Sequence, residues 1–255
     1  MIIEYQRPQN LNEALILLGR EEPVSYPLGG GTVLNRASSE KISVIDLQAL
    51  GLNTTSKKGT TINIGATTSL QELLGIEGLP VDFYKVVELD ANYNLRQMAT
   101  IAGRLVTADG RSPLSTVMLA LNATIELQEL EKKPIKVNIG DWLPLRNASK
   151  PGKLITLVSI PSNVHLAYEY IARSPADLPI ICVALAQWDS GRTRLALGGW
   201  GNSPILALDG PNSDGIEYAA NSAYSIADDE WASGEYRQEM AGLLSLRCLK
   251  QLNID

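Results

Sequence analysis

The spacing of apolar positions along the chain predicts an alternation of short helices and strands. Over residues 10–19 the apolar side chains recur every three or four positions, which is typical of a helix. Asn10 suits the start of this helix and Gly19 its end. Residues 42–47 and 61–66 are rich in β-branched side chains, and the second stretch alternates as a half-buried strand does. The first third of the chain therefore predicts a mixed helix-and-strand unit.

Further along the chain, local signals mark several more elements. Ser69 and Glu72 have the spacing of a capping box, and Ser112 followed by Pro113 suits the start of another helix. Strands are predicted over 123–129 and 153–160, a β-hairpin over 180–197 and a final helix over 235–252.

These elements predict an α+β fold in two domains. The first covers 1–165 and divides into pieces of about 1–55 and 56–165. The second covers 166–255 and consists of a small antiparallel sheet with a helix.

Composition narrows the class of protein. The 255 residues are 45% hydrophobic and carry a formal charge of −6, without clusters of Lys or Arg. This argues against a nucleic-acid-binding surface or a polybasic membrane patch. No segment approaches the roughly 20 apolar residues that a membrane span needs. The opening residues 1–5 show no export signal, so a cytoplasmic location is expected.

Two segments carry the best candidates for ligand binding. Gly29-Gly30-Gly31-Thr32 presents successive backbone N–H groups with no Cβ to block a ligand, as in a backbone nest for an anion. Thr100–Arg104, within a compact turn predicted over Ala99–Leu105 before a helix, offers a similar arrangement with a guanidinium added. Two such turns would hold the two phosphates of a dinucleotide from opposite sides. The residues alone leave open a plain structural connection, with Arg104 as a solvated charge.

Other kinds of site find little support. Neither segment fits the Rossmann G-x-G-x-x-G pattern or the Walker phosphate loop. His165 is the single histidine and is predicted to be an ordinary surface or strand-end residue. Cys182 lies in an apolar run and is predicted to be a core residue, so two cysteines and one histidine give no metal site. No catalytic residue is identified.

At the two glycine-containing segments the sequence resembles the FAD-binding (medium) subunit family of the molybdenum hydroxylases, or molybdopterin dehydrogenases. This family includes the medium subunits of carbon monoxide dehydrogenase and the flavin domain of xanthine dehydrogenase. Gly29–Thr32 is similar to the family's first flavin loop, and Leu95–Gly103 resembles the second, commonly written IRN-x-ATIGGN. Tyr168-Glu169 and Ala196–Gly199 resemble its C-terminal domain, so the similarity runs through the whole chain in order.

The resemblance implies a bound FAD, with its diphosphate wrapped by the two loops. The implied cofactor-binding residues are Leu28, Gly29, Gly30, Gly31, Thr32, Val33 and Leu34 in the first loop, Thr100, Ile101, Ala102, Gly103, Arg104 and Thr107 in the second, and Ile155 against the isoalloxazine ring.

The resemblance also implies a role in electron relay. Electrons would leave a substrate at the molybdenum cofactor of a large subunit, pass the iron–sulfur clusters of a small subunit, and reach FAD and then an external acceptor. Molybdenum and iron–sulfur clusters are expected only in those partners, and a homodimer of heterotrimers is a compatible assembly.

The sequence departs from the family pattern at several positions. Ala102 stands where the family has glycine, Arg104 where it has asparagine, and Val33 where it has an acidic residue. Pro113 stands where an aspartate is expected near the FAD ribose, and Tyr170 where a lysine is usual near the flavin. Two alternatives therefore stay open: a degenerate flavin domain that has lost FAD and serves as a scaffold, and a stand-alone flavin reductase or oxidase.

Overall fold

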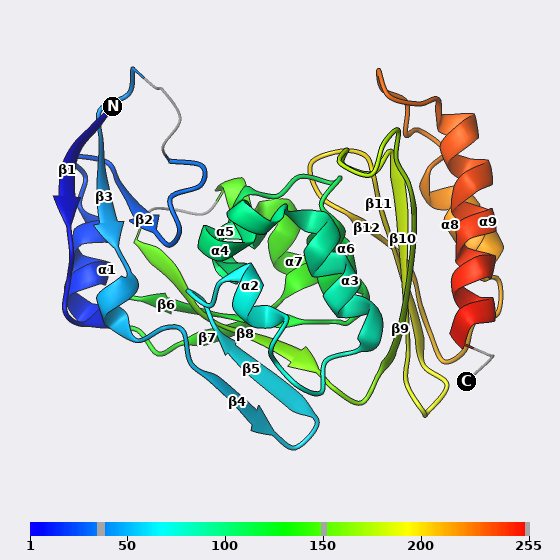
Figure 1. Cartoon of the computed structure of the whole chain (residues 1–255), viewed down its shortest axis with the longest axis horizontal. Helices are drawn as coiled ribbons and strands as arrows, with labels where there is room; N and C mark the ends of the chain where they lie inside the picture. The colour runs from blue at the N-terminus through cyan, green and yellow to red at the C-terminus, as the bar shows by residue number, and fades with distance from the viewer. Residues whose placement is uncertain (35–38, 149–151, 253–255) are drawn as a thin grey trace.

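Three sheets follow one another along the chain, and helices fill the spaces between them (Figure 1). The computed structural model describes residues 1–34, 39–148 and 152–252. The first sheet is parallel, with its strands in the order β1 (Ile2–Gln6), β3 (Ile42–Asp46), β2 (Ser25–Leu28).

Helix α1 (Leu11–Gly19) covers one face of this sheet. Asn10 begins it, because the Asn10 side chain accepts a hydrogen bond from the Glu13 N–H at 2.9 Å. The Glu13 carboxylate in turn accepts from the Gln9 N–H at 2.9 Å. The buried residues Ala14, Leu15 and Leu18 of α1 form one cluster with Ile45 and Leu47 at the first sheet and Leu154 of the second. This shared cluster fixes the two units to each other.

The second sheet is antiparallel and has five strands in the order β4 (Thr55–Lys58), β5 (Thr61–Gly65), β8 (Lys153–Pro161), β6 (Thr124–Glu129), β7 (Ile135–Asn138). The helices of this unit are α2 (Leu70–Leu73), α3 (Val81–Asp90), α4 (Tyr93–Met98), α5 (Ile101–Thr107), α6 (Pro113–Ala120) and α7 (Ile139–Trp142), with the 3₁₀ helices η1 (Gln48–Leu50) and η2 (Leu143–Ala148).

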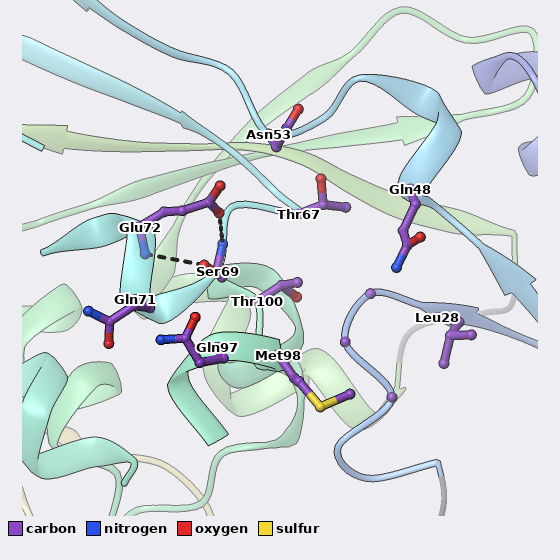
Figure 2. Close-up of a pocket in the computed structure, with 13 residues that line it drawn as sticks. Leu28, Gln48, Asn53, Thr67, Ser69, Gln71, Glu72, Gln97, Met98 and Thr100 are labelled. Atoms are coloured by element: carbon purple, nitrogen blue, oxygen red, sulfur yellow. Dashed lines mark hydrogen bonds between the residues drawn. The ribbon is translucent and has the colours of Figure 1, made fainter. Parts of the chain in front are cut away.

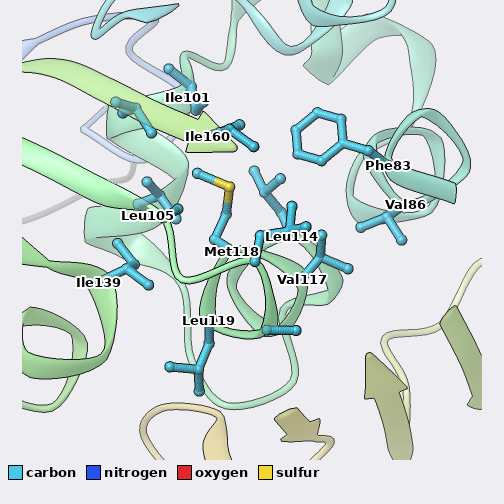
Figure 3. Packing of buried hydrophobic residues seen from close by; sticks show 14 of the residues in the cluster. Phe83, Val86, Ile101, Leu105, Leu114, Val117, Met118, Leu119, Ile139 and Ile160 are labelled. Atoms are coloured by element: carbon cyan, nitrogen blue, oxygen red, sulfur yellow. The ribbon is translucent and has the colours of Figure 1, made fainter. Parts of the chain in front are cut away.

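Helix α6 is the centre of the largest core. All eight of its residues are buried. In Figure 3, Met118 lies between Leu105 of α5 and Leu114, with Ile160 of β8 beside it, and all four belong to one buried cluster. A helix buried on every side needs no polar face, which explains the run of small and apolar residues in its sequence.

The third sheet is antiparallel, in the order β12 (Ile205–Gly210), β11 (Thr193–Gly198), β10 (Ile181–Gln187), β9 (His165–Ile171). Helices α8 (Ile216–Ala223) and α9 (Gly234–Leu252) lie on one face, and α3 and α6 lie on the other (Figure 1). Alternate residues of β10 therefore enter two different cores: Cys182 and Ala184 face α6, while Val183 and Leu185 face α9. Burial on both faces accounts for its unbroken apolar sequence.

The predicted α+β fold is confirmed, and so are most of the predicted elements. The helix starting after Ser112, the hairpin of β10 and β11 and the final helix all lie within one or two residues of their predicted bounds. The compact turn predicted over Ala99–Leu105 is wrong, because most of these residues open helix α5, with the Thr100 side chain as its cap. Ile101 and Leu105 are four residues apart and both fully buried, so they hold this helix on the core.

Candidate functional site

A cleft of about 760 Å³ separates the first unit from the second. Its size lies within the range of small-molecule and cofactor sites. Figure 2 shows the loop after β2 on one side and the segments around α2 and α4 on the other. The cleft is lined by Leu28, Gly29, Gly30, Gly31, Gln48, Asn53, Thr67, Ser69, Gln71, Glu72, Gln97, Met98 and Thr100.

The glycines of the first loop let the two sides of the cleft come close together. A Cβ on Gly30 would lie 1.6 Å from the Met98 carbonyl oxygen, and one on Gly29 would lie 2.7 Å from Thr100 Oγ1. Gly31 has a φ of 67°, in the left-handed region that favours glycine. Within the described residues, no acceptor pairs with the N–H groups of Gly29, Gly30 or Gly31. All three glycines line the cleft, and successive unpaired N–H donors are what a backbone site for an anion requires.

A buried carboxylate supports this loop from behind. Leu28 pairs with Asp46 across β2 and β3, and Asp46 is 3% exposed. One Asp46 oxygen accepts a hydrogen bond from the Gln48 N–H at 2.9 Å, and the other accepts from the Tyr5 hydroxyl. That bond to a carboxylate raises the pKa of Tyr5. Asp46 thus fixes the position of Gln48 at the wall of the cleft.

The second loop uses its N–H groups within the protein. The Ile101 N–H donates to the Thr68 carbonyl at 2.9 Å and the Ala102 N–H to the Ala66 carbonyl at 3.2 Å. The Gly103 N–H donates to the Thr100 hydroxyl at 3.1 Å. The first turn of α5 is therefore already paired, in contrast to the nest that the sequence predicts.

Arg104 does not reach the cleft. Its guanidinium forms an ion pair with Asp90, whose side chain is fully buried. Asp90 also accepts hydrogen bonds from the Ser112 hydroxyl at 2.9 Å and the Leu114 N–H at 3.2 Å, at the start of α6. The structure therefore pairs the Arg104 guanidinium, expected to be directed at phosphate, with a buried carboxylate, and Arg104 does not line the cleft. Pro113 is buried at this same junction.

The remaining predicted cofactor residues lie outside the cleft lining. Thr32, Val33 and Leu34 form a half-buried turn just beyond it. Thr107 ends α5 and its hydroxyl donates to the Gly103 carbonyl at 2.9 Å. Ile155 is 6% exposed and packs in the main core, so the structure does not bring it to the cleft.

Sequence reasoning missed most of the polar side chains that line the cleft. Four amide side chains line the cleft, together with three hydroxyls and one carboxylate: Gln48, Asn53, Gln71 and Gln97, then Thr67, Ser69 and Thr100, then Glu72. Within the described part of the chain, the lining includes no lysine or arginine. The Ser69–Glu72 capping box was a visible signal, since it begins a helix directly beside the second loop.

The other singled-out residues take structural positions. His165 begins β9 at the surface, with Asp189 3.3 Å away, as expected for a strand-end residue. Cys182 is fully buried, and burial raises the pKa of its thiol to about 11. Among residues 1–34, 39–148 and 152–252, no cluster of His, Cys, Asp and Glu has the arrangement of a metal site.

Helix length and hydropathy bear on membrane crossing. In the portions of the chain that the structure describes, no helix is long and apolar enough to span a bilayer.

The sequence profile of the family described as the FAD binding domain in molybdopterin dehydrogenase matches residues 1–163. The chain belongs to this family. It is 27% identical to the carbon monoxide dehydrogenase medium chain of Afipia carboxidovorans, over 97% of this chain and 96% of the relative. It is 24% identical to the glyceraldehyde dehydrogenase medium chain of Sulfolobus acidocaldarius, over 97% of each chain. This family membership makes it an oxidoreductase flavoprotein subunit with FAD as its cofactor.

A solved structure shows that the similarity to carbon monoxide dehydrogenase extends to the fold. A chain of reconstituted CO dehydrogenase from Oligotropha carboxidovorans superposes with a TM-score of 0.82 at 26% identity, covering 97% of this chain and 96% of that one. The correspondence therefore extends over the whole α+β fold. In the present chain the residues fit the flavin dinucleotide at the first loop, where three N–H groups are unpaired among the described residues, and less well at the second, where they are paired.

Proposed function

We propose that this chain is the FAD-carrying electron-transfer subunit of a multi-subunit molybdenum-dependent oxidoreductase. The observation that carries the proposal is the cleft, which has the size of a cofactor site and is lined by Gly29–Gly31, whose N–H groups are unpaired within the described residues. Its partners would be a large subunit with the molybdenum cofactor and a small subunit with iron–sulfur clusters. A homodimer of such heterotrimers is the proposed assembly.

The chain's own residues would bind and orient the cofactor. The Gly29–Gly31 N–H groups would donate to the diphosphate oxygens, as N–H nests do. Gln48, held by Asp46, and Thr100 would stand on either side of the diphosphate. When bound, FAD would supply a redox centre that accepts electrons from the iron–sulfur partner and passes them to an external acceptor.

The test is an absorption spectrum of the protein purified together with its partner subunits, followed by heat release and chromatography of any flavin. We expect flavin absorption bands and stoichiometric release of FAD. A colourless, intact complex that stays empty after incubation with excess FAD would overturn the proposal.

A second candidate function is a scaffold subunit that keeps the fold without FAD. The second loop favours it, because a phosphate there finds no unpaired N–H from Ile101 to Gly103. It predicts a stable but flavin-free complex. Restoring the family's aspartate at Pro113 is a poor test, since this position is buried beside the Asp90 carboxylate. Ala102→Gly is the better variant.

A stand-alone flavin reductase would need a proton donor over the flavin. Tyr170 is the residue that would serve, and it stacks on Tyr168 with ring centroids 5.9 Å apart. Tyr170 is not among the residues that line the cleft. The structure therefore gives this third function no support of its own.

A further inference from the structure

Helix α9 lies at the end of the molecule farthest from the first sheet (Figure 1). One of its faces packs on β9 and β10 and includes the buried residues Ala241, Leu244 and Cys248. A second face contacts α8 so closely that a Cβ on Gly242 would lie 2.5 Å from the Asn221 side-chain oxygen. The remaining face of α9 is exposed to solvent.

Four residues form a stripe along this exposed face: Glu239, Leu243, Leu246 and Lys250, which we call the α9 seam. They follow one another at intervals of four, three and four positions, the alternation by which helices pair in coiled coils. Leu243 is 41% exposed and Leu246 43%. A single exposed leucine needs no partner, but two at neighbouring seam positions between opposite charges form a surface that another helix can cover.

The charges of the α9 seam have no counterpart within their own helix. Glu239 and Lys250 are eleven residues apart, which is about 16 Å along the helix axis and too far for an ion pair. Among the described residues, neither side chain has a hydrogen-bond or ion-pair partner. Glu235 lies four positions before Glu239, and Arg247 lies three before Lys250, so each end of the seam gathers charges of one sign. Such like-charged pairs slightly destabilise an isolated helix.

A second copy of the same helix, running antiparallel, matches the seam at every position. A twofold axis through the midpoint of the seam places position 239 of one copy opposite position 250 of the other, and position 243 opposite 246. Glu239 then faces Lys250 of the second copy at both ends, and Leu243 faces Leu246 in the two layers between. The parallel arrangement would instead place Glu239 opposite Glu239 and Lys250 opposite Lys250, which repel.

We infer that the α9 seam is an interface between two copies of this chain, which pair antiparallel about a twofold axis. The inference goes beyond the proposed FAD function and does not depend on it. The leucine layers supply the buried apolar area, and the ion pairs set the direction of pairing. One pair of helices buries less area than a standard interface, so the dissociation constant should be on the order of 10–100 µM.

Sedimentation velocity of the full chain, between about 1 and 300 µM, measures this pairing over the expected range of dissociation constants. We expect monomer at the lowest concentration and dimer at the highest. Glu239→Lys places lysine opposite Lys250, and Lys250→Glu places glutamate opposite Glu239. Each variant alone should dimerise about tenfold or more weakly, because both ion pairs become repulsive contacts. An equimolar mixture of the two variants should recover the dimer, since opposite charges meet again at both ends.

Matched controls separate the seam from general effects of charge and apolar surface. Glu230→Lys makes the same charge change at an exposed position outside α9 and should leave the dimer unchanged. Leu243→Ala should raise the dissociation constant by about fivefold or more. Leu145→Ala removes the same atoms from a leucine of η2 that is 65% exposed, and it should have no effect. Circular dichroism checks that each variant keeps its fold.

Each outcome decides for or against the inference. A chain that stays monomeric at all concentrations overturns it, and so does a dimer that both charge reversals leave intact. Reversals that weaken the dimer without recovery in the mixture overturn the antiparallel pairing. A monomeric chain whose Glu239→Lys variant no longer co-purifies with partner subunits assigns the seam to a partner and also overturns the inference. The FAD content of the same samples tests the proposed function separately, so either can fail alone.

Discussion

The two loops that meet across the cleft both contain glycine, but they differ in whether their backbone N–H groups are paired. The first loop, Gly29–Gly31, leaves its N–H groups without described acceptors. The second, Thr100–Gly103, pairs the N–H groups of its last three residues inside the protein: with Thr68, Ala66 and the Thr100 hydroxyl. The first loop directly follows strand β2, whereas the second forms the start of helix α5.

The difference teaches that glycine content alone does not identify an anion nest. In the second loop the helix cap and the bridge between Ser69 and Thr100 take up the donors. In the first, the glycines let the backbone approach Met98 and Thr100, and their N–H groups have no acceptor among the described residues. We therefore expect the first loop to bind phosphate and the second loop to hold the cleft wall in place.

The largest effect should come from Arg104→Gln. This substitution leaves the Asp90 carboxylate fully buried and without its cation, so the free energy of unfolding should fall by about 3 kcal/mol. Urea unfolding followed by circular dichroism measures it. FAD affinity per folded molecule should change less than about threefold, since Arg104 pairs with Asp90 and does not line the cleft.

The double variant Asp90→Asn with Arg104→Gln supplies the control for this prediction. The side-chain amide introduced at position 90 would still accept from Ser112 and Leu114, so the neutral pair should be more stable than Arg104→Gln alone. A loss of FAD affinity with full stability in Arg104→Gln would show instead that the guanidinium contacts phosphate.

Gly30→Ala should have the next largest effect and should act on both properties. Its Cβ would lie 1.6 Å from the Met98 carbonyl oxygen, so backbone must move, at a cost of about 2 kcal/mol of stability. The shift misplaces the N–H donors, and FAD affinity should fall by about tenfold or more. Gly75→Ala is the control, because its Cβ would meet a neighbour at an ordinary 3.5 Å. Equal behaviour of the two variants in FAD titration would contradict the close approach.

Sequence alone predicted the features that depend on near neighbours. The caps at Asn10, Ser69 and Ser112 depend on residues three positions away, and the hairpin of β10 and β11 depends on a short turn. That the two glycine-containing segments face each other was predicted from the residues themselves, and the structure brings Gly29 and Gly30 against Thr100 and Met98.

The parts that sequence missed depend on contacts between distant positions. Asp90 is 14 residues from Arg104 and 22 from Ser112, and nothing local marks it as their common partner. The amide side chains of Gln48, Asn53 and Gln71 come from separate segments that only the fold brings together. Helix α4 was overlooked because its residues were interpreted only as part of a loop motif.

Ala102→Gly tests whether the second loop can be returned to the family pattern. The Ala102 N–H already donates to the Ala66 carbonyl, so removing the methyl group opens no donor for phosphate. We expect FAD affinity within about twofold of the parent, and a loss of about 0.5 to 1 kcal/mol in stability because glycine is less favourable in a helix. Isothermal titration and urea unfolding measure the two quantities. A large gain in FAD affinity would favour the scaffold function, with a second loop that has lost its ligand through this methyl group.

The smallest expected effect is that of salt on FAD affinity, and it tests whether the first loop alone binds the diphosphate. The described lining includes no lysine or arginine and one carboxylate, Glu72, so the diphosphate is expected to bind through neutral N–H donors. Between about 50 and 500 mM NaCl, a site that depends on cations loses attraction through screening, whereas hydrogen bonds from backbone amides are barely affected. FAD affinity should therefore change by less than about twofold over this range, measured by fluorescence titration of the complex. A steep decrease with salt would mean that a cation reaches the phosphates and that the first loop does not bind them alone.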